Sequence, residues 1–201
     1  MNPYAPSDRE MARLKQYIAA QFQNASVLPI DELNIMGVRK RVRGMYDRIE
    51  QMIEAAMRRV ASEAASEFAE VDSAAIVAAV LAMYHPVTEY VYRRELSRKE
   101  DRLVESLVAN GESRQAVRRS YSRASRLLTA QVGFYLDICV DEARHAAMRE
   151  AGVTHVVWVT QMDGRTCETC RERNGRVYDI DNVPDKPHLG CRCYTLPVAE
   201  G

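Results

Sequence analysis

The strongest constraint on the fold is a long helical repeat of apolar residues between Ser113 and Gly152. Apolar side chains recur there about every 3.6 residues, which is the α-helical period. They are Val117, Tyr121, Ala124, Leu128, Val132, Tyr135, Cys139, Ala143 and Ala146. Ser113 is a good N-cap and Gly152 a good stop, so we expect one helix between them, with Cys139 as an ordinary core residue. A helix of this length can bury the apolar face that these residues form only by packing against other long helices.

Two helices are expected near the start of the sequence. The pattern Ser7-x-x-Glu10 fits a capping box and predicts a first helix beginning at Ser7. A break follows over residues 24–29. Asp31 is the expected N-cap of a second helix, which spans roughly residues 32–70.

A third helical segment is expected from about Ser73 to Asn110. Pro86 should kink or interrupt it, because proline lacks the amide proton and clashes with the preceding turn. Residues 1–151 are therefore predicted to form one helical region, an elongated bundle or hairpin of long helices.

The pattern changes at residue 152. Residues 153–160 are rich in β-branched side chains and predict a strand. Residues 166–173 could form one or two helical turns, and short strands are expected near residues 177–178 and 193–197. The fold class is therefore mainly α, with a second domain at residues 152–201 that forms a small α+β module.

Composition excludes several classes of protein. The sequence has 28 basic and 28 acidic residues, so its formal net charge is zero, which excludes a basic tail protein or an acidic disordered one. No apolar run is long enough for a transmembrane helix, so no membrane association is expected. The N-terminal residues lack the pattern of a secretory signal, so the cysteines are expected to be reduced or metal-bound.

Four of the five cysteines crowd into the C-terminal module together with one histidine. Zinc is bound by four nitrogen or sulfur ligands in a tetrahedron. A small module with little apolar core is stabilised by metal binding, because the binding free energy adds to its folding free energy. We therefore predict that a structural zinc ion clips the module together. The expected ligands are Cys167, Cys170, His188 and Cys191, with Cys193 as the alternative fourth ligand. An all-cysteine set without His188, unliganded thiols and a Cys167–Cys170 disulfide remain alternatives.

The module also carries an ordered motif. It reads Trp158-x-Thr160-x-x-Asp163-x-Arg165-Thr166-Cys167-x-x-Cys170-x-x-x-Asn174-Gly175, then Pro187-His188-x-x-Cys191-Arg192-Cys193 and Pro197. This motif resembles the C-terminal signature of phage head-morphogenesis proteins, the minor head proteins typified by the F protein of phage Mu. The resemblance covers the residues from Trp158 onward.

The resemblance implies a structural virion component, a minor head protein near the portal vertex. Such a protein acts in head assembly or in genome packaging and ejection through protein contacts. Its partners would be the portal and other head or connector proteins, with packaged DNA as a further candidate. Several copies would sit in the head or neck of the virion, after assembly in the host cytoplasm.

The resemblance implies no catalytic residue. Five residues of the motif would instead shape structural turns: Asp163, Arg165, Asn174, Gly175 and Arg192. Arg192 would pair with Asp163 or face a partner. We also expect no enzyme from the residues themselves. A catalytic zinc keeps an open position, whereas five soft ligands surround this one, and no G-x-S-x-G, Walker A or H-E-x-x-H motif occurs.

The alternative function is a zinc-stabilised nucleic-acid-binding protein. Five arginines within thirteen residues of the long C-terminal helix have no acidic residue among them: Arg114, Arg118, Arg119, Arg123 and Arg126. Several would share a helix face and could contact phosphates. The zero net charge favours the simpler interpretation, a solvated face of the bundle.

Overall fold

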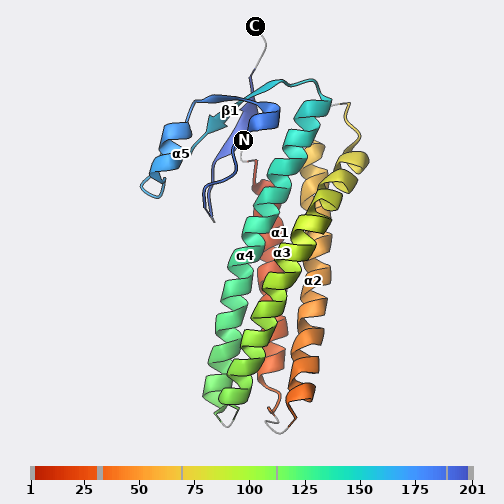
Figure 1. Ribbon diagram of the computed structural model, residues 1–201, viewed down its shortest axis with the longest axis vertical. Helices are drawn as coiled ribbons and strands as arrows, with labels where there is room; N and C mark the ends of the chain where they lie inside the picture. Colours follow the sequence, from red (N-terminus) through yellow and green to blue (C-terminus); the bar gives the residue numbers. More distant parts are fainter. Residues whose placement is uncertain (1–2, 31–33, 69, 112, 189, 199–201) are drawn as a thin grey trace.

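The computed structural model describes residues 3–30, 34–68, 70–111, 113–188 and 190–198, apart from the side chains of residues 83–96. Four long helices form an up-and-down bundle, and a small three-stranded module sits at one end of it (Figure 1). The helices are α1 (Ala5–Ser26), α2 (Ile35–Ala65), α3 (Ser73–Ala109) and α4 (Arg114–Glu150). The predicted fold class, a mainly helical bundle followed by a small α+β module, is confirmed.

The long C-terminal helix forms as its repeat predicts. Ser113 caps α4 by accepting a hydrogen bond from the backbone N–H of Ala116 (3.3 Å). The helix ends at Glu150, and Gly152 adopts the positive φ of +80° that glycine tolerates. Cys139 is buried in the bundle core.

The predicted capping box at Ser7 is wrong. Helix α1 begins at Ala5, its N-cap is Tyr4, and no side chain caps it. The Ser7 hydroxyl instead donates to the Asp137 carboxylate on α4. A tertiary contact therefore takes the hydroxyl that the local pattern assigned to the helix end. The helix also continues to Ser26, into the expected break.

The expected bounds of α2 also differ from those found. Asn34 is the N-cap and its Oδ1 accepts from the backbone N–H of Gly37 (2.8 Å), while the expected cap, Asp31, lies outside the described residues. The helix ends at Ala65, and the hydroxyl of Ser66 bonds back to the carbonyl of Ser62 (2.7 Å). A serine hydroxyl that bonds to the carbonyl four residues earlier slightly destabilises a helix, which favours its end at this point.

Helix α3 is assigned as one helix through Pro86, so the proline does not interrupt it. A proline costs one backbone hydrogen bond, and packing of α3 against both α2 and α4 outweighs that cost. Among the described residues, no helix has an apolar stretch long enough to cross a membrane.

Small side chains let the helices approach closely along the bundle core. Four fully buried alanines of α2 line it: Ala56, Ala61, Ala64 and Ala65. Larger groups fill the other end, where the Phe22 ring packs edge-on against Tyr46 (5.8 Å between centroids) and Tyr121 (6.3 Å). The bundle thus has an extensive core of its own, and Tyr194 of the module packs against it.

The C-terminal module is a three-stranded antiparallel sheet in the order β2-β1-β3. Its elements are β1 (His155–Val159), α5 (Glu168–Arg173), β2 (Val177–Asp179), a short 3-10 turn (Ile180–Asn182) and β3 (Tyr194–Pro197). Val156 and Trp158 are both buried, as expected for alternate residues on one face of the central strand. Val156 packs with Met148 of α4, whereas Trp158 packs on the cysteines. The division into domains at residue 151 stays a prediction.

Candidate metal centre

Helix α5 presents the first two cysteines. Cys167 is its N-cap, and the Cys167 sulfur accepts a hydrogen bond from the backbone N–H of Cys170 (3.4 Å). Cys170 lies in the first turn and is almost fully buried. The helical turns expected over residues 166–173 are present from Glu168 onward, and Cys167 precedes and caps them.

The segment after β2 returns the other three candidate ligands to the same place. Gly190 adopts a φ of +73°, and the backbone N–H of Cys191 donates to the carbonyl of His188 (3.3 Å), so the chain turns tightly between them. The candidate ligand atoms then fall into two sets of three, and within each set all three atoms lie within 4.8 Å of one another. One set is Cys167, Cys170 and His188; the other is Cys170, Cys191 and Cys193.

The two sets share Cys170 and therefore form one cluster, which can hold a metal ion. Its buried side is made by Cys170, Cys191 and Cys193, while His188 is exposed. The ligand set predicted from the sequence combines the first group with Cys191. Cys191 and Cys193 both belong to the second set, together with Cys170, so the identity of the fourth ligand stays a prediction.

The sulfur spacing fits a shared metal ion. The sulfurs of Cys170 and Cys191 are 3.6 Å apart. Two sulfurs bound to one tetrahedral zinc, at about 2.3 Å each, would be separated by about 3.8 Å. A disulfide needs only about 2.05 Å. None of the five cysteines forms a disulfide in the structure.

The electrostatics of the thiols also favour a cation. Burial raises the pKa of Cys170 and Cys191, because a buried thiolate without a counter-charge is unfavourable. At Cys167 the hydrogen bond from the Cys170 backbone lowers the pKa, and His188 adds to this. A metal ion would supply the charge that lets the buried thiols ionise together.

Two residues behind the cysteines support the cluster. The Thr160 hydroxyl donates to the Cys170 carbonyl (2.9 Å) and lies 3.3 Å from the Cys193 sulfur. The Trp158 ring packs on the buried cysteines, with the Arg173 guanidinium 5.1 Å from its centroid. The sequence interpretation gave Thr160 no role. Thr160 directly follows β1 and lies two residues after Trp158, so it continues the buried alternation of the strand, and this was the signal that could have found it.

The turn before α5 is tied to the turn that carries the last cysteines. Arg192 Nη2 forms an ion pair with Asp163 and contacts both carboxylate oxygens, at 2.7 and 2.8 Å, while Nη1 donates to Gln161 Oε1 (2.6 Å). Asp163 Oδ1 also accepts from the backbone N–H of Arg165 (2.9 Å). The hydrogen bond from Arg192 is the main reason that the pKa of Asp163 is lowered. Arg192 thus takes the first of the two roles that the sequence left open.

Asn174 and Gly175 close the end of α5 against β1. Asn174 Oδ1 accepts from the backbone N–H of Thr160 (2.9 Å). Gly175 has a φ of +77°, and its N–H donates to the carbonyl of Trp158 (2.8 Å). These two contacts hold α5, and with it Cys170, against the central strand.

A network that the sequence did not suggest joins the cluster to the bundle. Tyr4 Oη lies 2.6 Å from both Asp141 Oδ1 on α4 and the Cys193 carbonyl, so one proton is shared between two acceptors. Lys186 donates to the same oxygen (2.8 Å) and pairs with Asp141 Oδ2 (2.7 Å). These residues are far apart in the sequence, and no local motif links them. The module is thereby fixed to both α1 and α4.

The five arginines proposed to contact phosphates all lie exposed on the first half of α4: Arg114, Arg118, Arg119, Arg123 and Arg126. None of them forms an ion pair with a described residue. Three arginines of α2 differ: Arg39 pairs with Asp101, Arg43 with Glu100 and Arg59 with Glu10. The structure therefore places the five arginines far from the cysteine cluster, towards the opposite end of the bundle (Figure 1).

Fold and site define a helical-bundle protein with a C-terminal Cys/His module able to hold a metal ion. Residues 100–196 match the family model described as phage Mu protein F like protein, so the C-terminal resemblance to that family is confirmed. An uncharacterized protein of Haemophilus influenzae is 31% identical over 70 residues, which make up 32% of this chain and 15% of that protein. The chain thus spans a small part of that relative. No solved structure gave a significant match.

Proposed function

We propose that this chain is a structural protein of a phage head, a minor head protein near the portal vertex that acts in head assembly or in genome packaging and ejection. The match of residues 100–196 to the phage Mu F-like family carries the proposal. The match includes α4 and the whole cysteine cluster, which are the parts that give the module its shape. The rigid module and the long helices provide surfaces for protein contacts, and we propose no catalytic role.

The proposed location is tested by fractionating particles of the phage that encodes the chain. Heads separated from tails and from free protein should contain the chain in several copies, measured by quantitative mass spectrometry. A C170S chain should be depleted from heads, because its module is misshapen. C139A is the matched control, since Cys139 is also buried but lies outside the cluster. Recovery of the intact chain only as free protein would contradict the proposal.

We further propose that the cluster holds zinc through Cys167, Cys170, His188 and Cys191, with Cys193 as the alternative to Cys191 or His188. The convergence of all five residues supports this, because a site with so many soft ligands is closed and structural. The chain supplies the ligands, and Thr160 and Trp158 orient them. Bound zinc would supply the positive charge that neutralises the buried thiolates.

Metal content and free thiols measured on one sample test the zinc proposal. We expect about one zinc per chain, as for a closed four-ligand site, and loss of that zinc in C167S. H188A and C193S then identify the fourth ligand, since only the variant of a true ligand should lose zinc. A protein without metal and with two fewer free thiols would contain a disulfide instead.

A second candidate function is binding of duplex DNA by the exposed arginines of α4. The specific observation is the contrast with Arg39 and Arg43 of α2, which are neutralised by acidic neighbours. Arg119, Arg123 and Arg126 have the spacing i, i+4, i+7 and so share one face of the helix. No acidic residue occurs on α4 before Asp137, so this half of the helix carries only positive charge. Phosphates are the groups such a surface would attract.

The DNA proposal is tested by the salt dependence of binding to a duplex of arbitrary sequence. Replacing Arg119, Arg123 and Arg126 with alanine should weaken binding and reduce the slope of log affinity against log salt by about 3. The matched control replaces Lys40, Arg58 and Arg102, three exposed cations on α2 and α3. An equal loss in both variants would show non-specific attraction only, and would overturn the assignment to α4.

A further inference from the structure

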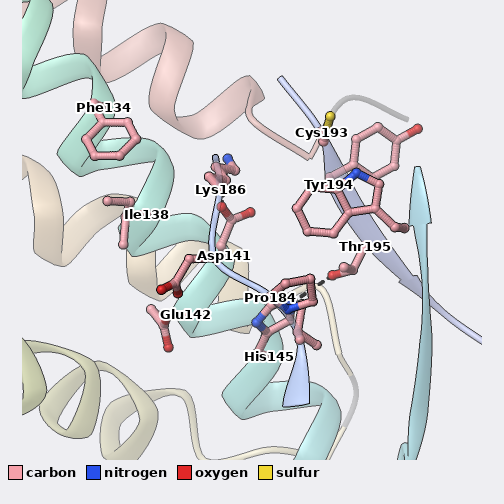
Figure 2. Close-up of a pocket in the computed structure, with 13 residues that line it drawn as sticks. Phe134, Ile138, Asp141, Glu142, His145, Pro184, Lys186, Cys193, Tyr194 and Thr195 are labelled. Carbon is pink, nitrogen blue, oxygen red and sulfur yellow. Dashed lines mark hydrogen bonds and ion pairs between the residues drawn. The ribbon is translucent and has the colours of Figure 1, made fainter. Parts of the chain in front are cut away.

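A cavity of about 410 Å³ separates α4 from the C-terminal module. Figure 2 shows Phe134, Ile138 and Glu142 along α4, with Pro184 and Thr195 of the module across from them. The volume is enough for a long side chain or a small ligand. The cavity lies beside the cysteine cluster but uses a different set of residues, apart from Cys193, which lines both.

The unbalanced charge in this cavity is negative. Lys186 is already neutralised by Asp141, 2.7 Å away. His145 contributes no charge near neutral pH, because burial lowers its pKa to about 4. Glu142 and Asp185 remain, and neither carboxylate forms an ion pair with a described residue. Arg149 is near Glu142, but its guanidinium donates to Asp181 (2.7 Å) and to the Ile180 carbonyl (3.2 Å).

Apolar side chains form much of the remaining lining, together with the polar residues Tyr194 and Thr195. Phe134 and Ile138 lie one turn apart on α4 and form one wall. Trp158 also lines the cavity, and it is 3% exposed. Its indole Nε1 is buried without a hydrogen-bond partner among the described residues. This nitrogen is itself shielded from solvent, so Trp158 contributes its ring to the wall of the cavity.

We propose that this cavity binds a lysine or arginine side chain presented by a partner protein. The methylene stem would lie along Phe134 and Ile138, as such stems do on apolar surfaces. The charged head would meet Glu142 and Asp185. Only the nature of that partner, another head protein, rests on the proposed function. The binding of a basic side chain does not.

The single tryptophan makes the cavity directly observable. In the full-length ¹⁵N-labelled protein with its metal, one indole N–H resonance reports Trp158. The probe is N-acetyl-L-arginine amide, and N-acetyl-L-citrulline amide is the uncharged analogue of the same shape. We expect a saturable shift of the indole resonance with the arginine probe. The citrulline probe should bind about tenfold more weakly or not at all, since it lacks the charge-assisted bond.

The variant E142Q should weaken arginine binding by about tenfold, which corresponds to one hydrogen bond to a charged group. The matched control is E54Q, an exposed glutamate of α2, which should bind as the original protein does. If E142Q does not fold, the substitution D185N on the exposed loop removes the other carboxylate of the cavity and tests the same charge requirement. Equal binding of both probes, or equal binding to E142Q and E54Q, would overturn the inference. Either result leaves the head-fractionation test of the proposed function unaffected.

Discussion

His145 and Asp141 lie one turn apart on α4 and respond to pH in opposite directions. Burial lowers the pKa of His145 from 6.5 to about 4. Between these values the unfolded chain binds a proton that the folded chain does not, so the free energy of unfolding falls as pH falls. Burial raises the pKa of Asp141 from 3.8 to about 6. Between these two pKa values of Asp141 the folded chain binds a proton that the unfolded chain does not, so the free energy of unfolding rises as pH falls.

The substitution H145Q separates the contribution of His145 from that of Asp141. In the original protein His145 Nε2 lies 2.7 Å from the Thr195 hydroxyl, and the glutamine amide can still bond to that hydroxyl. Between pH 7 and pH 5 the original protein should lose about 2 kcal/mol of unfolding free energy relative to the variant. Urea denaturation with excess zinc at each pH measures this difference. Asp141 and the cysteines titrate in both proteins, so they cancel. H155Q, which removes an exposed histidine, is the control, and a similar pH-dependent difference there would contradict the assignment.

At the scale of elements, the helix starts depend on single capping residues. Asp72 caps α3, and its Oδ1 accepts from the backbone N–H groups of Ala74 (3.1 Å) and Ala75 (3.0 Å). Its own backbone N–H donates to Glu150 at the end of α4 (2.8 Å). The cap therefore holds the start of one long helix next to the end of another, below the module.

Replacing Asp72 with alanine should lower the free energy of unfolding by about 1 kcal/mol, because two helix N–H groups lose their acceptor. Asparagine at the same position keeps an acceptor oxygen and should restore most of the loss. Equilibrium denaturation monitored by circular dichroism at the helix band provides the measurement. An equal loss for D72A and D72N would show that charge near the helix end, rather than the cap, is responsible.

The expected helices form because their apolar repeats are long and regular, as on α4. The errors occur where a residue has a stronger partner elsewhere in the fold. Ser7, for example, bonds to Asp137 rather than to its own helix. The early end of α2 has a local cause instead, since the Ser66 hydroxyl bonds to the Ser62 carbonyl of the same helix. In the candidate metal centre, spacing alone indicated the cysteines and His188. It could not indicate Tyr4, because the contact from Tyr4 to Cys193 joins opposite ends of the sequence.

At the scale of the whole molecule, the bundle and the module are stabilised differently. The bundle has an extensive apolar core, while the module has one small cluster around Trp158 and the cysteines. The module meets the bundle through Met148, Val156 and Ile180 and through the Tyr4 network. A metal ion would therefore matter far more to the module than to the helices.

Removal of metal by a chelator, or the substitution C170S, should unfold the module but leave most of the helical circular dichroism intact. Fluorescence of Trp158 reports the module alone, because the chain has no other tryptophan. The two signals should therefore separate, with the fluorescence change at lower denaturant concentration. The control variant C139A should show the same fluorescence and circular dichroism transitions as the original protein. Loss of most of the helical signal in C170S would show that the helices depend on the module.

The contact between Tyr4 and the cluster also sets an order of events during synthesis. Tyr4 leaves the ribosome long before Lys186 and Cys193, which it contacts in the finished protein. Helices α1 and α2 can pair as soon as both have emerged, but the upper end of α1 must remain exposed to water until the last strand is made. The docking of Tyr4 therefore waits for β3, and a chaperone that shields the first residues would act in that interval.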